Sequence, residues 1–67
     1  MLTLSMNGEA VVLTRSINLS TLLEQQAYQM KKIAVAINGE FVPRSRYNDT
    51  MINDGDQVDV IQAVGGG

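Results

Sequence analysis

The sequence predicts an α+β domain in which one helix packs across one face of a mixed sheet of four to five strands. Two observations lead to this prediction. Short alternating apolar segments flank two Asn-Gly dipeptides, and a single segment spaces its leucines as a helix does. At 67 residues the chain can bury only one small core, so we expect a single domain over residues 1–64 and a glycine tail over residues 65–67.

A β-hairpin is predicted in the first segment, MLTLSMNGEAVVL. Leu2, Leu4 and Met6 alternate with polar residues, which is the pattern of a strand with one buried face. Asn7-Gly8 follows directly, and both central residues of a type I′ turn need positive φ, which Asn and Gly tolerate.

One amphipathic helix is predicted over residues 19–30. Its apolar positions recur at spacings of three and four and form a stripe that we interpret as core: Leu19, Leu22, Leu23, Ala27 and Met30. Either Asn18 caps the helix or a T-x-x-E capping box begins at Thr21; Asn18 is preferred because it keeps the first leucine in the stripe. Lys31 and Lys32 follow, where cations suit the helix dipole.

A second hairpin is predicted around Asn38-Gly39. Branched apolar residues alternate with alanines over residues 33–37, which indicates a strand whose second face carries only small side chains. Pro43 ends the pairing because it has no N–H to donate. The next segment, PRSRYNDTMI, is expected to be irregular, with room for one short helical turn.

The last strand is predicted in QVDVIQAV, after a polar turn at Asp54-Gly55. The segment NDGDQVD lacks the spacing of a calcium loop, and we interpret it as a turn plus a solvated face. The first and last strands are the most regularly apolar, so we expect them to pair in parallel at the centre of the sheet. This arrangement is the β-grasp, or ubiquitin-like, fold.

Composition excludes several functional classes. The chain has no cysteine and no histidine, so disulfides, thiolate metal sites and the usual general base are absent from the sequence, and we expect no enzyme. A net charge of −2 and scattered aromatics disfavour nucleic-acid binding. The longest apolar run is about five residues, far short of a membrane span, so a cytoplasmic domain without membrane contact is expected. Arg44 and Arg46 are interpreted as surface charge, with contact to an acidic partner as the alternative.

The faces of the last strand give the first functional indication. Alternation places Val58, Val60 and Val64 on the face toward the helix and places Asp59, Ile61 and Ala63 on the opposite face. An outward isoleucine is either a scattered surface hydrophobe or part of a docking patch for a partner. Spacing alone leaves both interpretations open.

Three final glycines, Gly65, Gly66 and Gly67, give the second indication. One interpretation is frayed chain, since glycine has the most backbone entropy to lose. The other is a slender arm that delivers an unhindered carboxylate into a narrow channel of a partner. Reaction of that carboxylate with ATP would form an acyl adenylate, which a sulfur or nitrogen nucleophile could then attack. The partner would supply ATP, Mg²⁺ and the catalytic groups.

The segment VAINGEFVPRSRYNDTMINDGDQVDVIQAVGGG resembles the ThiS family of sulfur carrier proteins in thiamine biosynthesis. The shared features are the N-G turn, V-P-R after it, the D-G-D turn, the apolar last strand and the terminal G-G, and the LLEQ helix fits the family's first half. The resemblance covers essentially the whole chain.

The resemblance implies that a ThiF-like, ubiquitin-activating-type enzyme adenylates Gly67. A cysteine desulfurase or sulfurtransferase then provides persulfide sulfur for a thiocarboxylate, which a ThiG-like thiazole synthase uses. Gly66 is the second residue of the required pair, and Gly65 adds reach. Ile61 matches an outward apolar position that related carriers use to dock, and Ala63 lies on the same face.

Three alternatives remain beside the thiamine carrier. The sulfur carrier of molybdopterin synthesis has the same fold and tail, but V-P-R after the hairpin favours the thiamine carrier. A ubiquitin-like protein modifier would pass its activated glycine to lysine amines. A passive β-grasp interaction domain would not need its tail.

Overall fold

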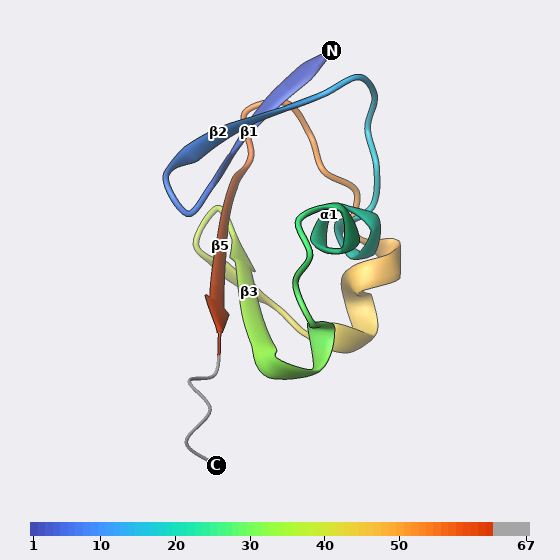
Figure 1. Cartoon of the computed structure of the whole chain (residues 1–67), viewed down its shortest axis with the longest axis vertical. Helices are drawn as coiled ribbons and strands as arrows, with labels where there is room; N and C mark the ends of the chain where they lie inside the picture. Colours follow the sequence, from blue (N-terminus) through green and yellow to red (C-terminus); the bar gives the residue numbers. More distant parts are fainter. Residues whose placement is uncertain (63–67) are drawn as a thin grey trace.

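A five-stranded mixed sheet with one α-helix packed across one face forms the domain (Figure 1). The computed structural model describes residues 1–62, apart from the side chain of Met30. The elements follow in the order β1 (Leu2–Met6), β2 (Glu9–Leu13), α1 (Leu19–Gln25), the 3₁₀-helix η1 (Met30–Lys32), β3 (Ile33–Ile37), β4 (Glu40–Val42), the 3₁₀-helix η2 (Arg44–Asp49) and β5 (Gln57–Gln62).

The strand order in the sheet is β2-β1-β5-β3-β4. β1 and β5 lie at its centre and run parallel, with Ser5 opposite Gln57 and Met6 opposite Val58. β5 is antiparallel to β3, and the two hairpins form the sides of the sheet. The predicted arrangement of one helix on a mixed sheet, with the first and last strands paired in parallel, is therefore confirmed.

Both predicted hairpin turns are present. Asn7 and Gly8 have φ values of 52° and 85°, and Asn38 and Gly39 have φ values of 53° and 83°. Positive φ at two successive positions is the requirement of a type I′ turn, whose twist matches that of the flanking strands. β4 ends at Val42, directly before Pro43, as predicted.

Helix α1 begins as predicted and ends earlier. The Asn18 side chain accepts the Thr21 N–H (2.8 Å), which confirms Asn18 as the N-cap. The predicted continuation to residue 30 is wrong, because α1 ends at Gln25 and Ala27 has a φ of 64°. Ala27 is exposed, and Lys31 and Lys32 belong to the separate helix η1.

The Asp54-Gly55 turn is also confirmed, with a φ of 84° at Gly55. The prediction that this segment presents a solvated face is wrong for Asp56, which is buried. Its carboxylate accepts the Asn53 N–H (2.8 Å) and the Asn38 side-chain amide (3.1 Å). Burying a carboxylate requires such donors, so Asp56 is part of the framework at the start of β5.

The core fills the space between α1, η2 and the inner face of the sheet. It consists of Leu4, Met6, Leu13, Leu19, Leu22, Leu23, Val35, Tyr47, Ile52, Val58 and Val60. The three leucines of α1 are fully buried, so the predicted apolar stripe is core over the length that is helical. Among the described residues, no helix is long and apolar enough to cross a membrane.

Candidate functional site

β5 leads into the C-terminal segment that carries the predicted site. The strand ends at Gln62, which pairs with Ile33 at the edge where β3 begins (Figure 1). The predicted site residues Ala63, Gly65, Gly66 and Gly67 lie outside the described residues, as does Val64. The described part of the site is therefore the strand that presents this segment and the surface around its end.

Two asparagine side chains hold β5 from its two sides. The Val60 N–H donates to Asn7 Oδ1 (2.8 Å), and the Gln57 N–H donates to Asn38 Oδ1 (3.0 Å). Each asparagine also donates its own backbone N–H to β5, to Val58 O (2.9 Å) from Asn7 and to Gln57 O (2.8 Å) from Asn38. The two Asn-Gly turns therefore serve as supports for β5, a role that the hairpin signal alone did not predict.

The two faces of β5 differ as predicted. Val58 and Val60 are 0% and 7% exposed on the inner face, whereas Ile61 is 69% exposed on the outer face. Asp59 is exposed on the outer face as well. The isoleucine thus presents its side chain to solvent one residue before β5 ends.

Neighbouring strands extend the apolar surface around Ile61. Ala34 lies opposite Ile61, Ala36 lies opposite Asp59, and Phe41 lies opposite Ala36 on the far side. Phe41 is 69% exposed, and sequence reasoning did not single it out. Glu40 and Phe41 are both exposed, so alternation along β4 alone does not assign Phe41 to this surface, and only its pairing with Ala36 does. We call Ile61, Ala34, Ala36 and Phe41 the outer apolar patch.

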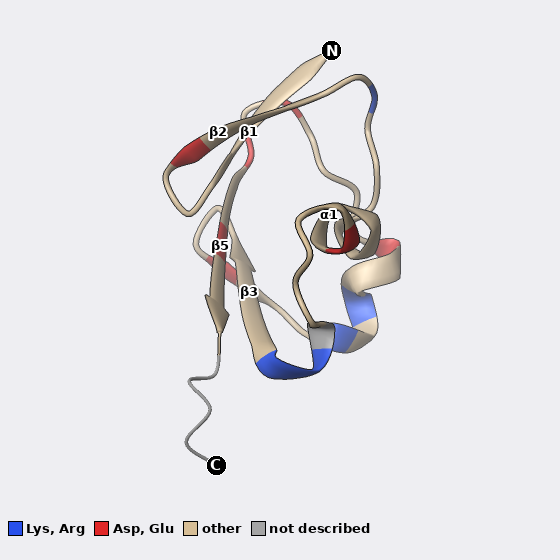
Figure 2. Ribbon diagram, in the orientation of Figure 1, with Lys and Arg blue, Asp and Glu red and all other residues tan. Residues whose placement is uncertain are grey.

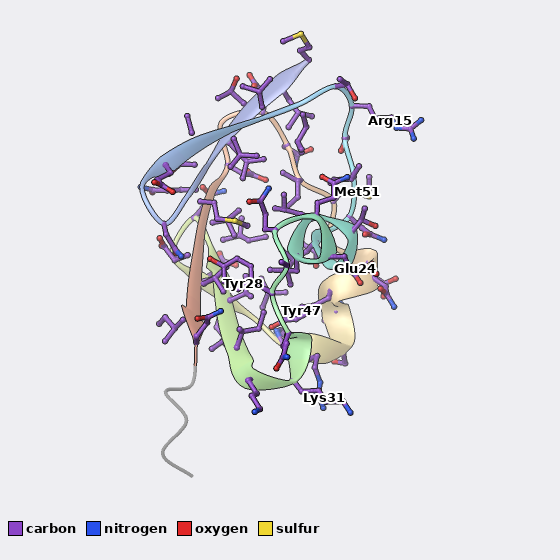
Figure 3. All side chains as sticks on the ribbon, viewed as in Figure 1. Arg15, Glu24, Tyr28, Lys31, Tyr47 and Met51 are labelled. Atoms are coloured by element: carbon purple, nitrogen blue, oxygen red, sulfur yellow. The ribbon has the colours of Figure 1, made fainter. Side chains whose placement is uncertain are left out.

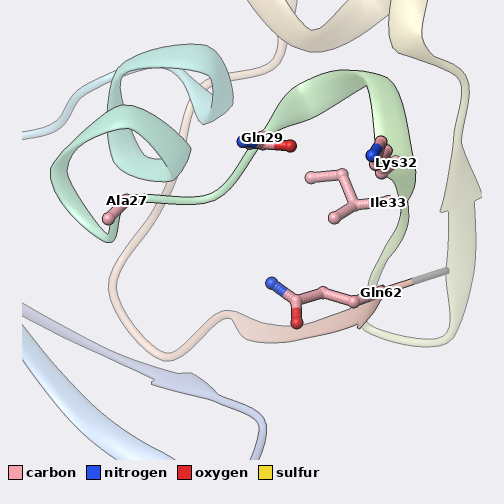
Figure 4. Close-up of a pocket in the computed structure, with 5 residues that line it drawn as sticks. All are labelled: Ala27, Gln29, Lys32, Ile33 and Gln62. Atoms are coloured by element: carbon pink, nitrogen blue, oxygen red, sulfur yellow. The ribbon is translucent and has the colours of Figure 1, made fainter. Parts of the chain in front are cut away.

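Two shallow hollows flank the end of β5. One, of about 320 Å³, is lined by Ala27, Gln29, Lys32, Ile33 and Gln62 (Figure 4). The other, of about 350 Å³, is lined by Lys31, Lys32, Ile33, Ala34 and Ile61. Amide and ammonium groups of this kind can bind the backbone and carboxylates of a partner chain. Within residues 1–62, no group of three or more His, Cys, Asp or Glu side chains could hold a metal ion.

Tyr47 anchors η2 beside this surface. Its side chain is buried in the core, while Arg44 and Arg46 on the same 3₁₀-helix are exposed. Burial raises the pKa of the Tyr47 phenol above its usual value, and the nearby Arg44 guanidinium partly opposes this rise. A neutral, buried Tyr47 therefore fixes the helix from which the two arginines project.

Comparison with known proteins agrees with this topology. The ThiS family model matches residues 3–67. The crystal structure of the thiamine biosynthesis protein ThiS from Geobacter metallireducens is similar with a TM-score of 0.84 at 30% identity, over 98% of this chain and 100% of that one.

Two relatives are similar in sequence. The sulfur carrier protein ThiS of Escherichia coli is 33% identical over 61 residues, which cover 91% of this chain and 92% of that protein. A thiazole synthase of Paramagnetospirillum magneticum is 36% identical over 64 residues, which cover 96% of this chain but only 20% of that protein.

The sheet order, the helix across it and the strand that leads to the terminal glycines define a β-grasp protein. Within this class, the chain belongs to the ThiS family.

Proposed function

We propose that this chain is the sulfur carrier protein of thiamine biosynthesis, with Gly67 as the residue that carries sulfur. The observation that supports the proposal most strongly is the match of the ThiS family to residues 3–67, which includes the terminal glycines. Support also comes from the Escherichia coli relative, a sulfur carrier protein that this chain matches over nearly its full length.

The chemistry begins at the C-terminal carboxylate of Gly67. An oxygen of this carboxylate attacks the α-phosphate of ATP, pyrophosphate leaves, and an acyl adenylate forms. The terminal sulfur of a persulfide attacks the acyl carbon and displaces AMP, which gives an acyl disulfide. A thiol of the sulfur-transfer enzymes then attacks the outer sulfur of this disulfide, is itself oxidised to a disulfide, and releases the thiocarboxylate. ATP, Mg²⁺ and the catalytic groups belong to a ThiF-like adenylating enzyme, and a cysteine desulfurase or sulfurtransferase supplies the persulfide. The carrier contributes the reacting carboxylate, the slender Gly65-Gly66 approach and the docking surface.

A ThiG-like thiazole synthase is proposed as the recipient of the sulfur. In the Paramagnetospirillum magneticum protein, a segment similar to this chain is part of a thiazole synthase. This observation favours the thiamine pathway over molybdopterin synthesis and over conjugation to lysine amines. Among residues 1–62, β5 is held by asparagines from both neighbouring hairpins, which supports a carrier that presents its terminal segment from a rigid base.

Thiol alkylation provides the direct test. The protein is incubated with its adenylating enzyme, ATP and a persulfide source, treated with an alkylating reagent and mapped by peptide mass spectrometry. Because the chain has no cysteine, a thiocarboxylate would be its one strongly thiol-reactive group. We expect a single adduct on Gly67, and none on a variant that lacks Gly67.

Intact mass alone would mislead, since exchange of one oxygen for sulfur adds nearly the mass of one oxygen and the four methionines can form sulfoxides. Absence of the adduct, with an enzyme and sulfur source of demonstrated activity, would contradict the carrier function. Lysine-linked conjugates in place of the adduct would indicate a protein modifier.

A further inference from the structure

Four of the five cationic side chains lie at the end of the molecule where β5 stops. Figure 2 shows Lys and Arg gathered at this end, whereas the acidic residues lie along the strands, in the loop before β5, on α1 and at the far end of η2. The four residues are Lys31, Lys32, Arg44 and Arg46, and each is exposed. A chain with a net charge of −2 thus has one distinctly cationic end.

Strand register explains why these residues come together. Ile33 lies opposite Gln62, so Lys32, one residue earlier, lies beside the end of β5. Val35 lies opposite Val42, so Arg44, two residues after Val42, lies near the start of β3. The sequence separates the lysines from the arginines by twelve residues or more, and only the β3–β4 pairing brings them to one edge.

Two of the cations border an apolar side chain of the predicted interface. Lys31 and Lys32 share the hollow of about 350 Å³ with Ile61, and Lys32 also borders the hollow beside Gln62. None of the four cations forms an ion pair with another residue in the described part of the chain. Glu40 lines a hollow together with Arg46, whereas no acidic side chain lines either of the two hollows that the lysines border.

We propose that Lys31, Lys32, Arg44 and Arg46 form a cationic rim that docks on an acidic surface of the adenylating enzyme around the entrance for the C-terminal segment. This inference rests on the proposed carrier function and specifies the surface that the partner presents. The rim lies at the base of the segment, and the five residues after Gln62 span at most about 18 Å when extended. The cations therefore meet the enzyme outside its nucleotide site and contact carboxylates of the protein surface.

Electrostatic attraction of this kind acts on encounter and orientation. Complementary potentials raise the association rate and suppress wrong orientations, and salt weakens both effects because the Debye length falls from about 30 Å at 0.01 M to about 8 Å at 0.15 M ionic strength. The rim would hold the molecule with its tail toward the channel while Ile61 settles onto an apolar surface.

The test compares two charge reversals with the same change in net charge. Lys32→Glu alters the rim, whereas Arg15→Glu alters the fifth cation, which lies near the opposite end of the molecule (Figure 3). Association rate and affinity for the adenylating enzyme are measured at about 20 mM and about 300 mM salt. We expect Lys32→Glu to weaken binding about tenfold at low salt and about twofold at high salt. Arg15→Glu should change binding less than twofold, and Lys32→Arg should bind like the natural protein.

Other outcomes separate this inference from the proposed function. If the unaltered protein is not adenylated at all, both proposals fail. If it is adenylated, but Lys32→Glu and Arg15→Glu bind alike at both salt concentrations, only the rim is refuted. Loss of binding to thiazole synthase alone would also overturn the proposal, since the acidic surface would then belong to the second partner. Thermal unfolding of each variant verifies that the fold is retained.

Discussion

Ala27 has a backbone conformation that usually belongs to glycine. Its φ of 64° lies in the left-handed region, where an L-residue with a Cβ is disfavoured by roughly 1–2 kcal/mol. The hydrogen bonds around it form a Schellman motif: the Ala27 N–H donates to Glu24 O (3.1 Å) and the Tyr28 N–H donates to Leu23 O (3.0 Å). Tyr28 then packs against the core, which stabilises the turn. The backbone strain at Ala27 is thus compensated by the packing of the next residue.

Substitution of Ala27 by glycine should stabilise the protein. Glycine removes the steric cost of positive φ but adds entropy to the unfolded chain, so we expect a net gain in the free energy of unfolding of about 0.5–1 kcal/mol. Urea denaturation measures this change. Ala10→Gly on strand β2 is the matched control and should lose about 0.5–1 kcal/mol. Equal destabilisation by both substitutions would show that the conformation at Ala27 carries no strain.

At the scale of elements, short sequence motifs correctly predicted the features that depend only on neighbouring residues. The two Asn-Gly turns, the Asn18 cap and the stop at Pro43 each depend on residues within a few positions, and each is present. The end of α1 was missed because QQAYQM continues the apolar spacing of a helix. Long-range packing of Tyr28 and the pairing of β3 with β5 decide that end instead.

The side-chain hydrogen bonds that support β5 were also not predicted, because they join residues that are far apart in the sequence. Asn7 Oδ1 accepts an N–H from a residue 53 positions away, and Asn38 Oδ1 accepts one from 19 positions away. The polar neighbours of Asp56 in the sequence predict a solvated face, whereas its donors include Asn38 in the turn between β3 and β4. Such hydrogen bonds depend on which strands are neighbours in the sheet. The strand pattern of the sequence predicts the strand order but not which side chains bond across it.

Asn7→Gly should separate the support of β5 from the turn that Asn7 also forms. Glycine tolerates positive φ, so the turn remains, but the acceptor for the Val60 N–H is lost. We expect a loss of about 1 kcal/mol in the free energy of unfolding and faster amide hydrogen exchange at Val60. Asn7→Asp retains an acceptor oxygen and should keep slow exchange there. Fast exchange in both variants would contradict the assigned role of the side chain.

On the scale of the whole molecule, the two faces of the sheet have different tasks. The inner face buries valines and leucines under α1, and the outer face exposes the apolar patch around Ile61. Strand alternation in the sequence alone predicted that Ile61 faces outward, near the segment that ends in three glycines. It did not predict Phe41 as part of that surface or the cationic rim, because both depend on which strands are neighbours. The end of β5, the exposed Ile61 and the lysines of the rim lie at one end of the described part of the molecule.

Adjacent residues of β5 allow the two tasks to be tested separately. Ile61→Asp should weaken binding to the adenylating enzyme about tenfold or more while changing the free energy of unfolding by less than about 1 kcal/mol, because the side chain is already 69% exposed. Ile61→Thr removes apolar area without a new charge and should also weaken binding to the adenylating enzyme.

Val60→Asp places a carboxylate in the core and should lower the free energy of unfolding by more than about 3 kcal/mol, enough to unfold so small a domain. Isothermal titration calorimetry and thermal unfolding measure the two quantities. A large stability loss for Ile61→Asp would mean that the outer face is part of the core, and unchanged binding would remove Ile61 from the docking surface.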